Sequence, residues 1–133
     1  MAIEDLPCSD ITGDVITAFF RAYDALQFGY LESTYAAALT HELRRMGRRV
    51  SREFLVEVVY DGVVISHHRL DMVVDEKVVL EIKATYALHP IAERQLRSYL
   101  RSTRLEVGLL LHFGPKAYFK RVVALNDHEL HRP

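Results

Sequence analysis

The sequence has little of what several classes of protein depend on. Its 133 residues include one cysteine, Cys8, which excludes a disulfide framework or a cysteine-based zinc site within a monomer and fits a reducing compartment. No stretch is long and apolar enough to cross a bilayer. The first ten residues are acidic and lack an apolar signal core. We therefore expect a cytoplasmic protein without membrane association.

An excess of charge of one sign is also missing. Seventeen lysines and arginines stand against 18 acidic residues, for a formal net charge of -1. No overall positive field attracts nucleic acid, so any such binding must use local patches. Half of the residues are hydrophobic, as in soluble globular proteins. The length suffices for one core and not for two ordinary domains, so we predict a single domain over residues 1–133.

Two helices are predicted in the first third of the chain. Ser9 or Asp10 can cap the first helix, and Gly29 breaks it. The second runs roughly over residues 31–46 and stops at Gly47. Both carry an apolar stripe at helical spacing. The stripes are Ile11, Val15, Phe19, Ala22, Tyr23 and Leu26 in the first helix, and Tyr35, Leu39, Leu43 and Met46 in the second.

The pattern then changes to the period of strands. Apolar residues alternate over 54–60, and Asp61-Gly62 between two apolar runs predicts a hairpin into a second strand over about 63–74. A turn at 75–77 leads to a third strand at 78–84.

Residues 89–90, His-Pro, open a third helix that extends to about 102. A buried strand follows at 105–113, then a turn at Gly114-Pro115, a last strand at 118–125 and a loose tail at 126–133. The order ααβββαββ predicts a central mixed β-sheet flanked by helices, an α/β fold.

Three acidic residues stand where apolar residues are expected. Glu32 projects within about 20° of the apolar face of its helix, although a helix-start carboxylate favoured by the dipole explains it alone. Asp71 lies inside the apolar run 70–74 of a predicted strand. Glu81 lies in the next strand, and Lys83 shares its face because it is two residues further on. On their own, Glu81 and Lys83 fit a solvated strand face equally well.

The register of the second hairpin decides whether these residues meet. A three-residue turn at 75–77 pairs Asp71 with Glu81, whereas a two-residue turn places Asp71 opposite Leu80 and breaks the site. Two facing carboxylates repel each other, and a divalent cation removes the repulsion. Oxygen ligands with a few waters suit magnesium or manganese. The hypothesis of a metal site therefore carries a prediction of register.

The third helix presents polar groups that could meet a substrate. Gln95 and Tyr99 are four residues apart and share a face, where they could bind a phosphate or a base, or form ordinary helix surface and core. Two arginine clusters could contact phosphates, or be solvated helix faces. One comprises Arg94, Arg97, Arg101 and Arg104 on the third helix, and the other Arg44, Arg45, Arg48, Arg49 and Arg52 near the end of the second.

The segment 29–35, GYLESTY, resembles the motif that names the GxxExxY protein family. That family is similar to the PD-(D/E)XK nuclease superfamily, particularly its RecB-like and lambda-exonuclease-like branch. There a helix glutamate, a strand aspartate, an E-x-K strand and a Q-x-x-x-Y helix follow one another. Glu32, Asp71, Glu81-Ile82-Lys83 and Gln95 to Tyr99 occur here in that order, and the resemblance covers about residues 10–125. One departure is Leu70, which replaces the proline before the aspartate.

The resemblance implies a restriction-endonuclease-like core and a metal-dependent nuclease, with DNA expected ahead of RNA as substrate. Asp71, Glu81 and the carbonyl of Ile82 would hold one or two Mg²⁺ or Mn²⁺ ions, and Glu32 would bind metal directly or through water. Lys83 would orient the attacking water. The residues that would position the substrate strand are Gln95, Tyr99 and the neighbouring Arg94, Arg97 and Arg101. The alternative is a catalytically silent nuclease-fold module in a larger assembly, and the apolar strands leave a homodimer open.

Overall fold

The computed structural model describes residues 6–124, and the predicted order of elements is confirmed. Residue 125, the last of the final predicted strand, and the tail at 126–133 lie outside the described residues. The elements are α1 (Ser9–Leu26), α2 (Glu32–Arg45), β1 (Val50–Tyr60), β2 (Val63–Val74), β3 (Val78–Lys83), α3 (Ile91–Thr103), β4 (Val107–Phe113) and β5 (Ala117–Val123). No helix within residues 6–124 is long and apolar enough to cross a membrane.

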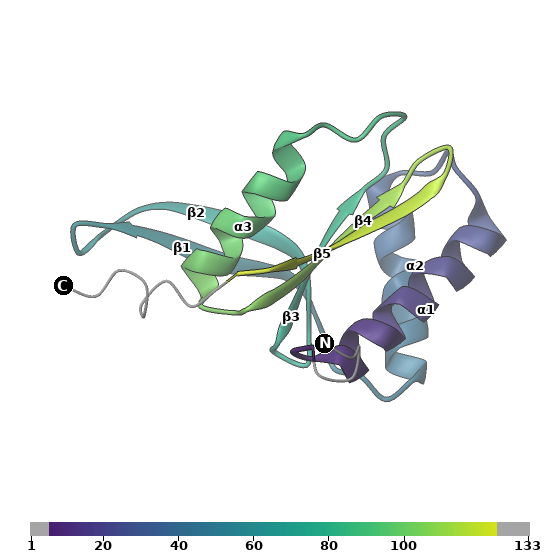
Figure 1. Cartoon of the computed structure of the whole chain (residues 1–133), viewed down its shortest axis with the longest axis horizontal. Coiled ribbons are helices and arrows are strands. Elements are labelled where there is room, and N and C mark those ends of the chain that lie inside the picture. Colours follow the sequence, from purple (N-terminus) through teal and green to yellow (C-terminus); the bar gives the residue numbers. More distant parts are fainter. Residues whose placement is uncertain (1–5, 125–133) are drawn as a thin grey trace.

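The five strands form one mixed sheet in the order β1-β2-β3-β4-β5. Neighbours are antiparallel except β3 and β4, which are parallel because α3 carries the chain back between them. Helices α1 and α2 cover one face and α3 covers the other (Figure 1). The predicted fold class, a mixed sheet flanked by helices in a restriction-endonuclease-like arrangement, is confirmed.

Strands β3 and β4 are mostly apolar because both of their faces are covered. All seven residues of β4 are buried, as are the first five of β3. Phe19 and Leu39 pack on the α1/α2 side of the sheet, and Leu96 packs on the α3 side. A carboxylate inside β3 therefore lies in apolar surroundings.

The start of α1 differs from the prediction. Cys8, not Ser9 or Asp10, occupies the N-cap position, and within residues 6–124 its side chain makes no capping hydrogen bond. The Ser9 N–H already closes a turn onto the Leu6 carbonyl at 3.3 Å, so the helix begins one residue early. Asp10 then lies in the first turn, where the helix dipole still favours a negative charge.

The turn between β2 and β3 has three residues, as the metal-site hypothesis requires. Val74 pairs with Val78, and Met72 pairs with Leu80. The predicted register is therefore confirmed up to Met72. Continuing it by one step places Asp71 opposite residue 81.

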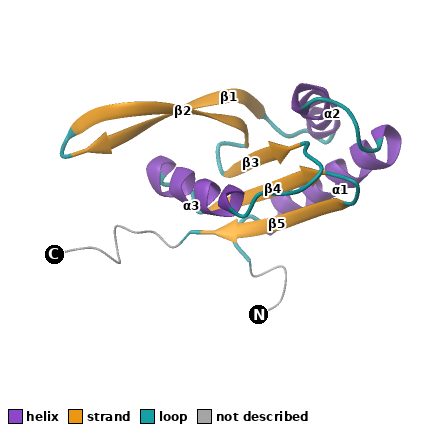
Figure 2. Ribbon diagram, turned by 90° about the horizontal axis from the view of Figure 1, so that it is seen from above, coloured by secondary structure: helices purple, strands orange, loops and turns teal. Residues whose placement is uncertain are grey.

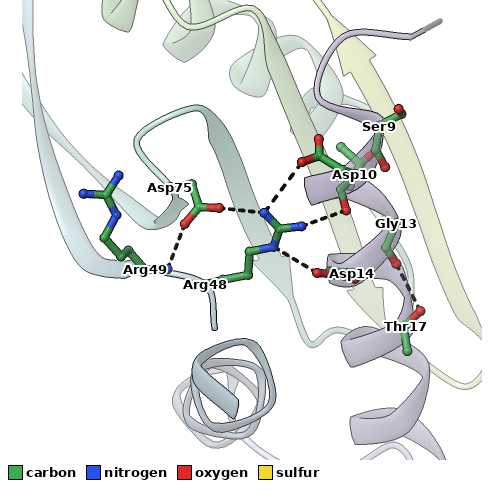
Figure 3. A network of polar contacts seen from close by, with 9 residues as sticks. Ser9, Asp10, Gly13, Asp14, Thr17, Arg48, Arg49 and Asp75 are labelled. Atoms are coloured by element: carbon green, nitrogen blue, oxygen red, sulfur yellow. Dashed lines mark hydrogen bonds and ion pairs between the residues drawn. The ribbon is translucent and has the colours of Figure 1, made fainter. Parts of the chain in front are cut away.

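Asp75, the first residue of this turn, is tied to the rest of the molecule (Figure 3). Its carboxylate accepts hydrogen bonds from the Arg49 backbone N–H at 2.8 Å and from Arg48 Nη1 at 3.0 Å. Burial alone would raise the pKa of Asp75, but these hydrogen bonds and the Arg48 charge lower it below its ordinary value. Arg48 Nε also donates to Asp14 of α1 at 2.9 Å. The turn that sets the register is thus anchored to α1 and to the α2–β1 loop.

The hairpin of β1 and β2 extends beyond the other strands (Figure 2). Asp61 and Gly62 both have positive φ, 54° and 75°, which fits the tight turn predicted there. Most of the outer half of the hairpin is exposed, with Val59 and Tyr60 at 59% and 71% exposure. The alternating pattern thus predicted the strand correctly, but of its apolar residues only Val56 is buried.

Candidate active site

Four residues of the predicted site come together where three elements meet. Glu32 is the first residue of α2, Asp71 lies in β2, and Glu81 and Lys83 lie in β3. The Ile82 backbone N–H donates a hydrogen bond to Asp71 Oδ2 at 2.7 Å, which ties the aspartate directly to the E-x-K strand. The charges also act on one another, since Asp71 and Lys83 each affect the pKa of both Glu32 and Glu81. The hydrogen bond from Ile82 and the effect of the Asp71 charge on the pKa of Glu81 thus show that the two strand carboxylates are close to each other.

An interruption in the β1–β2 ladder explains how Asp71 is oriented. Arg52 pairs with Met72 and Phe54 with Leu70, while Glu53 between them has a φ of 54°. Met72 and Leu70 pack on opposite sides of the sheet although they are two residues apart, so β2 twists between them. Asp71 therefore lies half-buried between two residues that pack on opposite sides of the sheet, rather than in a regular row of side chains.

Glu81 is the most perturbed group of the site. It is only 8% exposed, and among residues 6–124 its Oε1 atom has no hydrogen-bond partner. Burial first, and then the negative charge of Asp71, raise the pKa of Glu81 to about 8, while Lys83 and the Asp71 backbone N–H act in the opposite direction. The metal-free site therefore holds a proton near neutral pH.

The other two carboxylates are shifted in the same direction. Burial raises the pKa of Asp71 and outweighs the Ile82 N–H and the Lys83 charge, which lower it. Glu32 is exposed as a residue, yet partial burial of its carboxyl group and the nearby Asp71 charge raise its pKa. Three acids that all resist ionisation form a site suited to a cation.

Tyr99 is the residue of α3 that reaches these carboxylates. Burial raises the pKa of its phenol, and the charges of Glu81 and Asp71 raise it further. Its ring also lies 5.3 Å from that of His68 on β2. The remaining predicted substrate residues, Gln95, Arg94, Arg97 and Arg101, are exposed on the same helix, and their contact with substrate stays a prediction.

A depression of about 280 Å³ opens beside the site, and the sequence did not indicate a role for some of the residues that line it. It is lined by Glu32, Ser33, Ala36, Arg52, Glu53, Arg69, Leu70, Asp71 and Ile82. Arg52, which the sequence groups with the arginines near the end of α2, lies in β1, and its charge lowers the pKa of Asp71. Arg69 lies two residues before Asp71 and pairs with Glu53 at 3.6 Å. The only sequence feature that could have pointed to Arg69 as a site residue is its position two residues before Asp71 in the same strand.

The family model of the PD-(D/E)XK nuclease superfamily matches residues 9–122. The chain belongs to the PD-(D/E)XK nuclease superfamily. Membership in the narrower GxxExxY family stays a prediction. No curated protein matches the chain.

Two solved structures are similar to this superfamily member. The crystal structure of SSO0001 has 18% sequence identity and a TM-score of 0.56, covering 91% of this chain and 62% of that chain. The chain thus spans less than two thirds of that protein, and the likeness supports the fold. A crystal structure of an alkaline exonuclease from Laribacter hongkongensis has 11% identity and a TM-score of 0.47, covering 92% of this chain and 73% of that chain.

The superfamily's name records an aspartate and a (D/E)-x-K pair, and Asp71 and Glu81 to Lys83 match that pattern. Leu70 stands where the name has proline. It is fully buried in the core cluster on the α3 side of the sheet, which an aliphatic side chain suits. Leucine in place of proline at position 70 is therefore compatible with the position of Asp71.

The residues present fit a divalent cation, although the described part of the chain, residues 6–124, holds no ready-made group of three His, Cys, Asp or Glu ligands. Magnesium commonly binds through one or two carboxylates and completes its shell with water and substrate oxygens. Asp71 and Glu81 would supply the carboxylates, and the unpartnered Glu81 Oε1 is a buried oxygen in need of a positive partner.

Proposed function

We propose that this chain is a divalent-metal-dependent nuclease that hydrolyses phosphodiester bonds, with DNA preferred over RNA. The chief support is Glu81, a buried carboxylate with an unpartnered oxygen beside a second carboxylate, Asp71. A cation would relieve both the burial cost and the repulsion. Membership in the superfamily supports the reaction class.

In this proposal each residue of the site has its own role. Asp71, Glu81 and the Ile82 carbonyl would hold one or two Mg²⁺ or Mn²⁺ ions, and Glu32 would bind directly or through water. A bound metal would lower the pKa of its water and would stabilise the charge of the transition state. Lys83, partly exposed on the Glu81 face of β3, would orient the attacking water and offset charge on the phosphate.

Helix α3 would hold the substrate strand. Tyr99 lies close enough for the charges of Glu81 and Asp71 to raise its pKa, and its hydroxyl can donate to a phosphate oxygen. Gln95 precedes it by one turn. Three arginines of this helix add positive charge for the backbone phosphates, namely Arg94, Arg97 and Arg101.

The test is cleavage of labelled single- and double-stranded DNA and RNA with Mg²⁺ or Mn²⁺ and with chelator. We expect metal-dependent cleavage that Asp71→Ala and Lys83→Ala each reduce by several orders of magnitude without unfolding the protein. Lys77→Ala is the matched control, because Lys77 is exposed in the β2–β3 turn.

Two results would oppose the proposal. Intact substrates together with no metal binding by calorimetry would rule out the enzyme. Equal cleavage by the Asp71→Ala variant would assign the activity to a contaminant or another site. Metal or nucleic-acid binding without any cleavage would favour the silent-module alternative instead.

A further inference from the structure

Exposed aromatic side chains gather on two loops that adjoin the site. Phe28 and Tyr30 lie in the α1–α2 loop, and Tyr86 lies in the β3–α3 loop; we call these three residues the aromatic patch. Their exposures are 39%, 51% and 79%. Glu32 follows Tyr30 by two residues, and Tyr86 follows Lys83 by three. The aromatic patch is therefore joined by short chain segments to both the helix and the strand of the site.

The two loops meet although they are far apart in sequence. The rings of Phe28 and Tyr86 lie 6.4 Å apart at an interplanar angle of 65°. The β3–α3 loop leaves the sheet at the end where β3 finishes, and the α1–α2 loop lies at that same end (Figure 2). The depression beside Asp71 is lined by Glu32 and Ser33, so it begins two residues after the last ring of the α1–α2 loop.

Buried groups hold the α1–α2 loop in place. Tyr35 is fully buried and stacks on Phe113, with ring centroids 4.0 Å apart. Its hydroxyl accepts a hydrogen bond from the Tyr30 N–H at 3.2 Å and donates one to the Gln27 carbonyl. The backbone of the loop is thus set by the core, and the Tyr30 ring also packs edge-on against Tyr35 at 6.1 Å while about half of Tyr30 stays exposed.

The β3–α3 loop is held in the same way. His112 is buried at the end of β4, and its Nε2 lies 2.7 Å from the Thr85 carbonyl oxygen. The Thr85 hydroxyl donates to the Ala87 carbonyl at 2.7 Å. Tyr86 lies between these fixed points and is mostly exposed. Its ring therefore contributes little to holding the loop and gains little from burial.

We propose that the aromatic patch stacks an unpaired nucleobase of the substrate strand beside the phosphate bound at the carboxylates. The proposal rests on the proposed nuclease function and names the substrate form it takes: a single strand or a frayed end rather than intact duplex. Aromatic rings bind bases of any sequence by stacking, and an exposed face is what such stacking needs. A protein surface is less suited to this place, because the patch adjoins a site that would bind phosphate.

The first experiment measures stacking without cleavage. Single-stranded oligonucleotides carrying 2-aminopurine at successive positions are titrated with the full chain in Ca²⁺ or chelator. We expect the fluorescence to be quenched at one or two positions. Tyr86→Ala should abolish the quenching and weaken binding about 5- to 150-fold, the range for losing one stacked base. Tyr86→Phe should retain both, because the ring remains.

The control is Tyr60→Ala, since Tyr60 is similarly exposed but lies at the tip of the β1–β2 hairpin. An oligonucleotide with an abasic residue at the quenched position adds a second check. There Tyr86→Ala should bind as wild type does, because no base is left to stack. Thermal unfolding confirms that each variant is folded.

The outcomes separate this proposal from the nuclease function. Quenching that depends on Tyr86 without any cleavage would support stacking while the nuclease function fails. Cleavage with no quenching, or with quenching equal in the Tyr86→Ala and Tyr60→Ala variants, would overturn stacking and leave the nuclease intact. Absence of binding to any single strand would overturn stacking, and capture of a protein by the aromatic patch would not rescue it.

Discussion

Replacing Glu81 by glutamine should change how the stability of the metal-free protein depends on pH. The folded protein raises the pKa of this carboxyl from 4.5 to about 8, mainly by burial. The folded state therefore holds the proton more tightly than the unfolded chain. The free energy of unfolding should fall as pH rises from about 4.5 to about 8 and then level off.

The size of the effect follows from the same shift. At about 1.4 kcal/mol per pH unit, ionised Glu81 costs the folded state on the order of 5 kcal/mol above pH 8. That is comparable with the whole stability of a typical small domain. Glu81→Gln keeps the shape and removes the titration, so its unfolding free energy should depend far less on pH. Asp71 and Glu32, whose pKa values are also raised, titrate in both proteins. The difference between the two curves of unfolding free energy against pH therefore reports the titration of Glu81 and its coupling to Asp71 and Glu32.

Urea unfolding in chelator at pH 5, 7 and 9 measures the effect, followed by the same series with Mn²⁺. Metal binding needs the ionised carboxylate, so Mn²⁺ should stabilise the wild type at pH 9 and leave Glu81→Gln almost unchanged. Glu57→Gln is the control, because Glu57 is exposed in the hairpin. Parallel pH curves for the wild type and Glu81→Gln, or equal stabilisation of both by Mn²⁺, would refute this account of the site.

Three further substitutions test the packing and the ion pairs that support the site. Gly108→Ala should lower stability by about 1–3 kcal/mol in urea unfolding, because the added Cβ would lie 2.9 Å from Cδ1 of the buried Leu96. Gly13→Ala, in α1 with no described atom within 4 Å of the new Cβ, should instead stabilise by roughly 0.5–1 kcal/mol. Arg48→Met should cost about 1–3 kcal/mol at pH 7 by leaving carboxylates unpaired. Part of that cost should disappear in acid, as the pH falls below the ordinary pKa of an aspartate and towards the lowered pKa of Asp75, because a protonated Asp75 no longer needs the arginine; a pH-independent loss would contradict the ion-pair account.

The order of the elements could be predicted from sequence because each has a clear local signal. Apolar residues three and four apart marked α1 and α2, and Asp61-Gly62 marked the first hairpin. The helix start was predicted wrongly, because a turn between Leu6 and Ser9 moves it by one residue. Such a turn depends on a few backbone angles that periodicity does not report.

The register of the second hairpin could not be predicted from the local sequence alone. Two turn lengths were open, and they differ in whether Asp71 meets Glu81. The three-residue turn is anchored by Arg48 and the Arg49 backbone, which come from a loop 26 and 27 residues away. The bend at Glu53 that brings Arg52 and Arg69 into the same depression likewise depends on how two strands twist between packed layers.

The sequence by itself determined which residues are chemically out of place: three carboxylates within apolar helix and strand patterns, with a lysine two residues after the last. It could do so because burying an acid is costly, and periodicity tells which positions are buried. Only the tertiary structure decided which groups share the site. It joined Asp71 to β3 through the Ile82 N–H, brought Tyr99 and Arg52 to the carboxylates, and placed Tyr86 against Phe28. These contacts join segments far apart in the chain, and their geometry is set by packing, which no local pattern contains.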